Sequence, residues 1–558
     1  MSDAATTAPA QEPAPAAPAS ASPPAGPPPA PENISPPQLA LYMLASLTFG
    51  LAQGMGNYLV SGNLQAVQAT FGATTNEAVW LMAGYSSTSI TASLLLWKLR
   101  TQFGLRRVAK IALVFLVVIS LAHVVVSDLH SAVLLRAVAG FAGAILNTLA
   151  FLYVLEALPL RHKLTTGIAL GLLGSQIAVP LSRLISPHLL EIGLWPQLNM
   201  VELVLSLMCL VWILVLPITP PVSAKVFDRV DAISLPLLIV GLGLIAVVLS
   251  LGRYYWWTEA SWLGFCLAVG LVCLTLLVAI ELNRERPLVN LHWLSSTDMI
   301  IFGGSMFFSR FILSEQTTGA IGFFQNLGLL NEHMAGMMWV IFFATLAGFL
   351  GVAPINKPEN RAAIQGTGLA LIAIGAWMES RGTSLTRPHD VLLSQGLVAF
   401  GGAIFLPPAV GWSFAHTLKW GIQHLTSFFA IFLASQNLGG LLGAAGLGSF
   451  LVIREKFHSS QIVENLTGAD PLVVQRIQQY GASYGRVLGD PALRSAEGST
   501  LLAQAATREA YVLAYNDLFL VVAIVSALCL LGLLSHLFIL WLGRRRARTD
   551  AARTAQPA

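Results

Sequence analysis

Long apolar runs joined by short polar loops constrain this chain more than any other feature. Most runs have about the 20 residues that an α-helix needs to cross a bilayer. Only 10% of the 558 residues are charged, whereas soluble domains carry about 25% because their surfaces face water. The chain is therefore expected to be an integral membrane protein. Fourteen runs are found, near 38–60, 78–98, 108–127, 131–157, 164–187, 196–217, 233–252, 260–281, 298–320, 333–354, 362–379, 390–413, 424–452 and 516–543.

These runs are expected to be helices, which makes the fold class all-α integral membrane. In hydrocarbon each backbone N–H and C=O has to be paired within its own segment, and the alternating pattern of a β-barrel is not present. Residues 1–37 are almost entirely Ala, Pro, Ser and Thr. Such a segment buries too little apolar surface to fold and is predicted to be a disordered tail.

Basic residues predict the orientation, because cytoplasmic loops retain Lys and Arg. With the N-terminus inside, the short outer loops hold only Arg253, Arg381 and Arg387. Reversing the chain would invert this asymmetry, so both termini are predicted to be cytoplasmic. The cytoplasmic set is Lys98, Arg100, Arg106, Arg107, Lys110, Arg161, Lys163, Lys225, Arg229, Arg284, Arg286, Lys357, Arg361, Lys419, Arg544, Arg545, Arg546, Arg548 and Arg553.

One connection, the outer segment 453–515, is much longer than the others. Its runs Leu472–Tyr484 and Leu501–Tyr515 have the spacing of amphipathic helices. The segment is interpreted either as a small cap over the outer face or as a docking surface for an extracytoplasmic partner.

Two short motifs resemble signatures of the major facilitator superfamily. The fourth span opens with Arg136 followed four residues later by Gly140, similar to the helix-four signature of that family. The loop between the second and third spans contains Gly104, Arg106 and Arg107, similar to its basic cytoplasmic gating loop.

Three further stretches narrow the resemblance to the fourteen-helix drug:proton antiporters of the EmrB/QacA type. They are Asp231 with Trp256-Trp257 and Glu281, the Gln-x-x-Gly-Gly-x-x-Gly pattern within 435–443, and the approach 508–519 to the last span. The resemblance implies a major facilitator fold with two six-helix bundles and two inserted helices. The expected parts are the bundle 38–217, a linker 218–290 with the inserted helices, the bundle 291–543 with outer loop 453–515, and a basic cytoplasmic tail 544–558.

This resemblance also implies a secondary active transporter that exports amphipathic or aromatic toxic compounds in exchange for protons by alternating access. The expected location is the plasma membrane, as a multi-pass protein of the bacterial inner membrane. Gram-negative relatives work with a periplasmic adaptor and an outer-membrane channel, which are the implied partners besides the lipid bilayer, the small organic substrate and protons.

The chain departs from the family pattern at several positions. Thr101 and Trp97 replace the Asp and the small residue of the gating loop, the fifth span reads 178–183 as Ala-Val-Pro-Leu-Ser-Arg, and 53–57 in the first span has no acid. These departures keep a facilitator or uptake transporter of another small organic solute as the alternative function.

Charged side chains inside the spans are candidates for proton coupling. A charge at the bilayer centre costs about 2.5–3.5 kcal/mol on insertion scales, so it is expected to face a cavity or a partner. The hypothesis is that Glu202 is the main protonatable acid with Arg136 as its partner, and that Glu315 and Arg310 are the equivalent in the second bundle. Arg183 is a further candidate. The alternative is a static ion pair between helices.

Polar residues on otherwise apolar spans are candidates for the substrate path, although each could instead bridge two helices. They are Asn57, Tyr85, Asn147, Gln325, Gln436 and Asn437.

Other classes of protein find little support. The sequence shows no paired carboxylates, no His/Cys set with metal-ligand spacing, no Ser/His/Asp arrangement and no phosphate-binding Gly-Lys-Ser/Thr motif. An enzyme acting on lipid-linked substrates is therefore a remote alternative. No catalytic residue, cofactor, metal or nucleic-acid partner is expected. A non-transporting sensor would need a folded soluble domain, which the terminal tails do not suggest.

Overall fold

The computed structural model describes residues 35–159, 162–192, 195–218, 227–284, 287, 291–420 and 425–554. Every regular element within these residues is helical. Residues 1–34 of the predicted tail 1–37 lie outside the described residues. Arg161, Lys225 and Arg286, which were used to predict the orientation, lie outside them as well. The side chain of Trp97 is also outside the described part.

Among the described residues, thirteen helices are long and apolar enough to cross a membrane. The predicted span 298–320 is not one of them, because its helix is interrupted. It consists of α13 (Thr297–Leu313), the π-helical segment η2 (Glu315–Ala320) and α14 (Ile321–Asn326). A π-helical turn contains an extra residue and often lies at a functional site, and here it carries Glu315.

The first bundle packs six long helices around two apolar clusters, one centred on Phe49 and Tyr153 and the other on Trp195. The fourth helix is capped by Asp128, whose Oδ2 accepts a hydrogen bond from the Ser131 N–H at 2.8 Å. Short helices α2 (Leu64–Phe71) and α3 (Thr75–Ala78) lie between the first two. The six are α1 (Pro36–Gly62), α4 (Trp80–Phe103), α5 (Leu105–Val125), α6 (Leu129–Ala157), α8 (Ile168–Ile192) and α9 (Trp195–Val215), with the π-helical η1 (Lys163–Gly167) before α8.

The second bundle contains the interrupted helix and five continuous ones, among which α17 contacts both α15 and α16. It meets the first bundle where α15 packs on α8 and α18 packs on α4. A four-residue helix, α12 (Leu291–Leu294), precedes α13. The five are α15 (Ala335–Ile355), α16 (Arg361–Glu379), α17 (Leu392–Trp420), α18 (Leu425–Glu464) and α20 (Pro491–Thr554).

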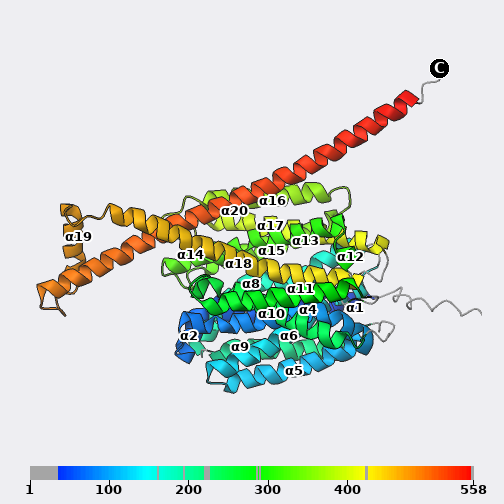
Figure 1. Ribbon diagram of the computed structural model, residues 1–558, viewed down its shortest axis with the longest axis horizontal. Helices are drawn as coiled ribbons and strands as arrows, with labels where there is room; N and C mark the ends of the chain where they lie inside the picture. The colour runs from blue at the N-terminus through cyan, green and yellow to red at the C-terminus, as the bar shows by residue number, and fades with distance from the viewer. Residues whose placement is uncertain are drawn as a thin grey trace, which may run out of the picture.

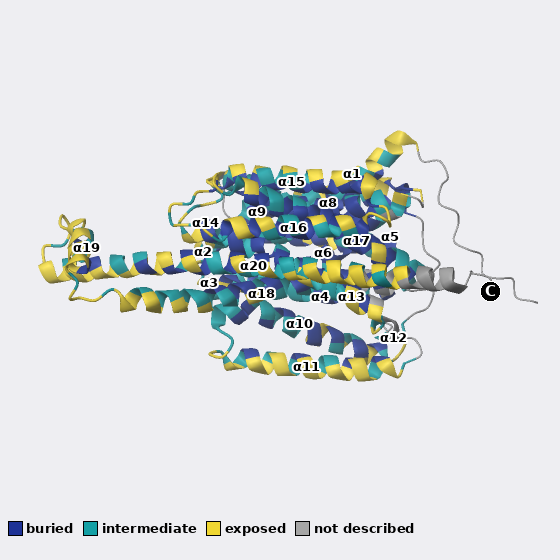
Figure 2. Ribbon diagram, turned by 90° about the horizontal axis from the view of Figure 1, so that it is seen from above, coloured by how far each residue is buried: buried dark blue, intermediate teal, exposed yellow. Residues whose placement is uncertain are grey.

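Two further helices, α10 (Asp231–Tyr255) and α11 (Ser261–Leu282), stand beside the bundles. α10 contacts α4 of the first bundle and α18 of the second, while α11 packs on α10 at the edge of the molecule (Figure 2). The outer face of α11 is apolar and exposed, with Phe265 at 71%. Such a face is expected to contact lipid.

The prediction of a cap over the outer face from 453–515 is wrong. α18 and α20 both continue beyond the other helices and carry α19 (Pro471–Ala482) at their far end (Figure 1). We call residues 453–515 the arm, and its end of the molecule the arm side. The chain enters α1 and leaves α20 at the opposite end, the termini side (Figure 1). The predicted tail 544–558 is likewise helical to Thr554, because α20 continues through it.

Candidate transport cavity and buried charges

A cavity of about 1210 Å³ lies between the two bundles. Its walls come from α1, α4 and α8 on one side and from α13, η2 and α18 on the other. Its rim includes the exposed residues Gln65, Glu191 and Glu332, which lie on the arm side. The cavity is therefore reached from the arm side.

Aromatic and aliphatic side chains close the floor of the cavity toward the termini side. Phe151 of α6 packs edge-on against Phe432 of α18, with ring centroids 5.6 Å apart. Both belong to a single apolar cluster shared by the two bundles, together with Leu172 and Phe349. Among the described residues, such packing gives water and polar solutes no favourable path from the cavity toward the termini side.

All six predicted substrate-path residues line this cavity. Asn57 and Tyr85 come from the first two spans, Asn147 from α6, Gln325 from α14, and Gln436 and Asn437 from α18. The structure thus brings the predicted set together, and its role in substrate passage stays a prediction.

The predicted pairing of Arg310 with Glu315 is wrong. Arg310 lines the cavity, and its Nε donates a hydrogen bond to Oε1 of Gln436. Residues five apart on a helix point about 140° away from each other, so the two side chains leave α13 and η2 in different directions. Gly439 leaves room for Arg310, because a Cβ at Gly439 would lie 3.0 Å from Arg310 Cβ. The Gln-x-x-Gly signature therefore positions this guanidinium.

Arg183 bridges the bundles at the cavity rim. Its Nη1 donates to Oδ1 of Asn331 at 2.9 Å and to the Gly62 carbonyl at 3.4 Å. The Asn331 amide in turn donates to Oδ1 of Asn63 at 2.9 Å. Arg183 forms no ion pair among the described residues. These hydrogen bonds therefore join α1 and α8 to the second bundle through neutral partners.

Arg136 and Glu202 form the predicted pair, with Nη1 and Oε2 3.7 Å apart. Neither lines the cavity. The guanidinium lies 4.6 Å from the ring centroid of Tyr85, and it is the Tyr85 ring that lines the cavity. The exposed fractions are 0% for Arg136 and 6% for Glu202. The pair therefore lies behind the cavity wall, and its part in proton coupling stays a hypothesis.

Glu315 faces a second acid that the sequence analysis missed. The amide nitrogen of Gln395 lies 3.1 Å from Oε1 of Glu315, and 2.8 and 3.0 Å from the two oxygens of Glu379. All three side chains are buried. Glu379 is the last residue of a predicted span, where an acid suggests a loop end rather than a buried group. The pairing of carboxylates, which the sequence does not show, is created by the tertiary structure.

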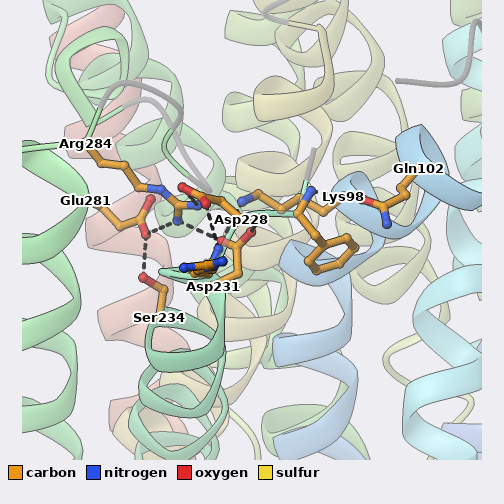
Figure 3. A network of polar contacts seen from close by, with 9 residues as sticks. Lys98, Gln102, Asp228, Asp231, Ser234, Glu281 and Arg284 are labelled. Carbon is orange, nitrogen blue, oxygen red and sulfur yellow. Dashed lines mark hydrogen bonds and ion pairs between the residues drawn. The ribbon is translucent and has the colours of Figure 1, made fainter. Parts of the chain in front are cut away.

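A third charged network holds α10 and α11 to α4 near the termini side (Figure 3). Oδ1 of Asp231 accepts from Lys98 Nζ at 2.5 Å and from Arg284 Nη1 at 2.7 Å. Arg284 also pairs with Glu281 at 3.1 Å, and Ser234 donates to Glu281 at 2.7 Å. This network ties the two inserted helices to the first bundle. The sequence marked Asp231 and Glu281 by resemblance but did not predict their partners.

The predicted gating loop connects α4 to α5 on the same side. Gly104 is the junction, Arg106 donates to the Leu214 carbonyl of α9 at 3.3 Å, and Arg107 is exposed. The position is that expected of the loop, and its gating role stays a prediction.

This arrangement of two helical bundles around a central cavity is the all-helical major facilitator fold. No family model matches the chain. It is a distant homologue of two bacterial proteins. It is 21% identical over 542 residues to the multidrug export protein EmrB of Haemophilus influenzae, covering 92% of this chain and 98% of that protein. It is 20% identical over 492 residues to the fatty acid resistance protein FarB of Neisseria gonorrhoeae, covering 85% and 92%.

Solved structures show the same fold. The human organic anion transporter MFSD10 aligns with a TM-score of 0.53 at 14% identity, over 88% of this chain and all of that one. The proton:xylose symporter XylE of E. coli aligns with a TM-score of 0.52 at 12% identity, over 87% and 94%.

Proposed function

We propose that this protein exports amphipathic organic compounds in exchange for protons by alternating access. The observation that carries the proposal is the cavity between the bundles, open on the arm side and sealed by the Phe151–Phe432 floor. A rocking motion that parts this floor and closes the rim would expose the same cavity to the termini side. Both relatives named above are described as an export or a resistance protein, which supports outward transport.

The proposed orientation places both termini in the cytoplasm of the bacterial inner membrane and the arm in the periplasm. The asymmetry of the basic residues supports it. In this orientation the arm extends away from the membrane toward an adaptor. We therefore include a periplasmic adaptor and an outer-membrane channel among the proposed partners.

The charges of the cavity favour an anionic substrate. Arg183 and Arg310 line it on opposite bundles, and neither forms an ion pair with any residue that the structure describes. The acids among its lining residues, Glu191 and Glu332, lie on the exposed rim. An uncompensated guanidinium in a partly apolar cavity attracts anions. The resistance to fatty acids that gives FarB its name agrees with a carboxylate head group.

Efflux from proteoliposomes tests the function. Vesicles holding the purified protein are loaded with pyrenebutyrate, a fluorescent amphipathic anion, and a pH gradient of either sign is imposed. We expect efflux to be faster when the outside of the vesicles is more acidic than the inside, because protons then move inward in exchange for the probe. Vesicles without a pH gradient give the reference rate. Glu202→Gln, measured alongside, should lose this acceleration if Glu202 is the main protonatable acid.

Protein-free vesicles provide the control for passive leakage of the weak acid. Counterflow that is unaffected by a pH gradient of either sign would identify a facilitator and overturn the proposal of proton coupling. Acceleration by a gradient of the opposite sign would identify an uptake transporter.

A further inference from the structure

We propose that Glu315 and Glu379 form a shared proton-binding site that is filled from the arm side. This inference deepens the proposed function, because it assigns the coupling proton to a carboxyl pair in the second bundle. It rests on an accounting of hydrogen-bond donors, on burial and on a second pocket.

The cluster contains too few donors for its acceptors. Two carboxyl groups and the Gln395 carbonyl supply five acceptor oxygens. The donors are the two amide hydrogens of Gln395, the Ser394 hydroxyl beside Glu379 and the Ala320 N–H beside Glu315, so four hydrogens face five oxygens. Oε2 of Glu315 and Oε1 of Gln395 are both buried without a hydrogen-bond partner. Buried polar atoms are nearly always paired. A proton on one carboxyl group creates the O–H donor that these orphaned acceptors lack.

The burial of two negative charges without a cation also favours one bound proton. Glu315 is 0% exposed and Glu379 is 5% exposed, and neither forms an ion pair within the described part of the chain. Two adjacent carboxylates without a cation would place two negative charges in a site of low polarity, which is strongly unfavourable. One bound proton leaves a single charge delocalised over a hydrogen-bonded pair.

Several ionisable groups on the surrounding helices have partners of their own. On α13, Arg310 bonds Gln436, and on α20 the Tyr515 hydroxyl accepts from Asn326. Asp517 of α20 accepts from Arg454 and contacts His458. At the entrance to α17, Asp390 accepts from the Arg387 backbone and contacts His389. Arg381 stacks on Trp377 with its guanidinium 4.6 Å from the ring centroid.

A small pocket gives the pair access from the arm side. It has a volume of about 170 Å³ and is lined by Glu379 together with Phe324 and the exposed residues Arg381 and Asp390. On the other side, Ser314 and Gln316, which flank Glu315 in the chain, line the main cavity. The pair thus lies between an entrance on the arm side and the wall of the transport cavity. A proton entering at Glu379 reaches Glu315 by direct transfer between the two carboxyl groups, while the Gln395 amide donates to both and holds them together.

Infrared spectroscopy of the full-length protein in lipid tests the site without requiring transport. A protonated carboxyl group buried in protein gives a carbonyl band that ionised groups do not give. We expect this band in the wild type near neutral pH and its loss on alkaline titration. The double variant Glu315→Gln/Glu379→Gln should lack it. Glu281→Gln is the matched control and should keep the band, because Glu281 is a buried acid that pairs with Arg284.

Vesicle efflux provides the second readout. With Glu379→Gln we expect the acceleration by a pH gradient to disappear while counterflow without a gradient persists, because glutamine reproduces the shape of the protonated acid. A band that persists in the double variant, or a gradient effect that survives Glu379→Gln, overturns this site. The infrared band could behave as expected while efflux by the wild type does not respond to the pH gradient. That result would support the proton-binding site and would refute the proposed coupling of transport to protons.

Discussion

At the scale of single residues, we expect Arg310 to have the strongest influence on which ligands the cavity binds. Its Nε donates a hydrogen bond to Gln436. Buried side-chain nitrogens without a partner occur among the described residues, but the two terminal nitrogens of Arg310 do not belong to that set. They are therefore available to a ligand in the cavity. The apolar floor beyond it, with Phe349 and Phe432, suits a hydrocarbon or aromatic tail. This arrangement predicts a preference for one charge type.

Binding of a matched pair of probes measures this preference. Pyrenebutyrate and pyrenemethylammonium share a fluorophore and differ in charge, and energy transfer from protein tryptophan reports their binding. We expect the anion to bind the wild type at least about tenfold more tightly than the cation, since a charge-assisted hydrogen bond contributes about 1.5–3 kcal/mol. Arg310→Gln should remove most of the difference, and Arg310→Lys should retain part of it.

Arg381→Gln is the control, because it removes the same charge outside the main cavity. An equal loss of selectivity in Arg381→Gln would mean that net surface charge, rather than Arg310, sets the preference. Tighter binding of the cation by the wild type would contradict the anionic substrate outright.

At the scale of secondary-structure elements, the close crossing of α4 and α6 determines where the buried charges lie. A Cβ at Gly140 would lie 2.1 Å from the Tyr85 carbonyl oxygen, so only glycine allows this approach. The crossing holds the Tyr85 ring over Arg136, and Thr88 donates to the Ala137 carbonyl across the same contact. The Arg-x-x-x-Gly signature thus has a packing reason: the glycine sets the distance at which the arginine meets its neighbours.

Gly140→Ala is expected to destabilise the first bundle by about 1–3 kcal/mol, the typical cost of overpacking a tight contact. The melting temperature in detergent, followed by tryptophan fluorescence, should fall. Gly264→Ala in α11 is the matched control, since a Cβ there meets nothing within 4 Å. Equal melting temperatures for Gly140→Ala and the wild type would show that the two helices separate at little cost.

At the scale of the whole molecule, the arm stands apart from the part that encloses the cavity. α19 packs against α20 at a distance from the bundles (Figure 2), and it buries few residues. The arm therefore contributes little to the stability of the bundles. Its length and position suit contact with another protein.

Replacing residues 466–489 by a short Gly/Ser linker tests the role of the arm. We expect an unchanged melting temperature and unchanged vesicle efflux, because the cavity and the buried acids are intact. In cells we expect resistance to amphipathic anions to be lost, because the proposed adaptor would no longer find its docking surface. Full resistance in cells expressing the shortened protein would contradict the docking role, and lost vesicle efflux would show that the arm belongs to the transport machinery.

The sequence by itself determined the membrane-spanning helical fold. In hydrocarbon the backbone N–H and C=O groups of each apolar run have to be paired within the run, and an α-helix does this. The sequence also picked out six polar residues that line the cavity, although it did not separate them from polar residues such as Gln395 that lie between helices instead. It could not determine which charges meet. Ordinary helix spacing already directs Arg310 and Glu315 to different sides, but only the tertiary packing brings Glu379 and Gln395 to Glu315.

The arm was also decided only by the tertiary structure. The amphipathic runs in 453–515 predict helices equally well whether they lie over the outer face or extend away from it. α18 and α20 run on without a break and carry the segment outward. Pairings between side chains far apart in the sequence depend on helix rotation and crossing, which local periodicity does not encode.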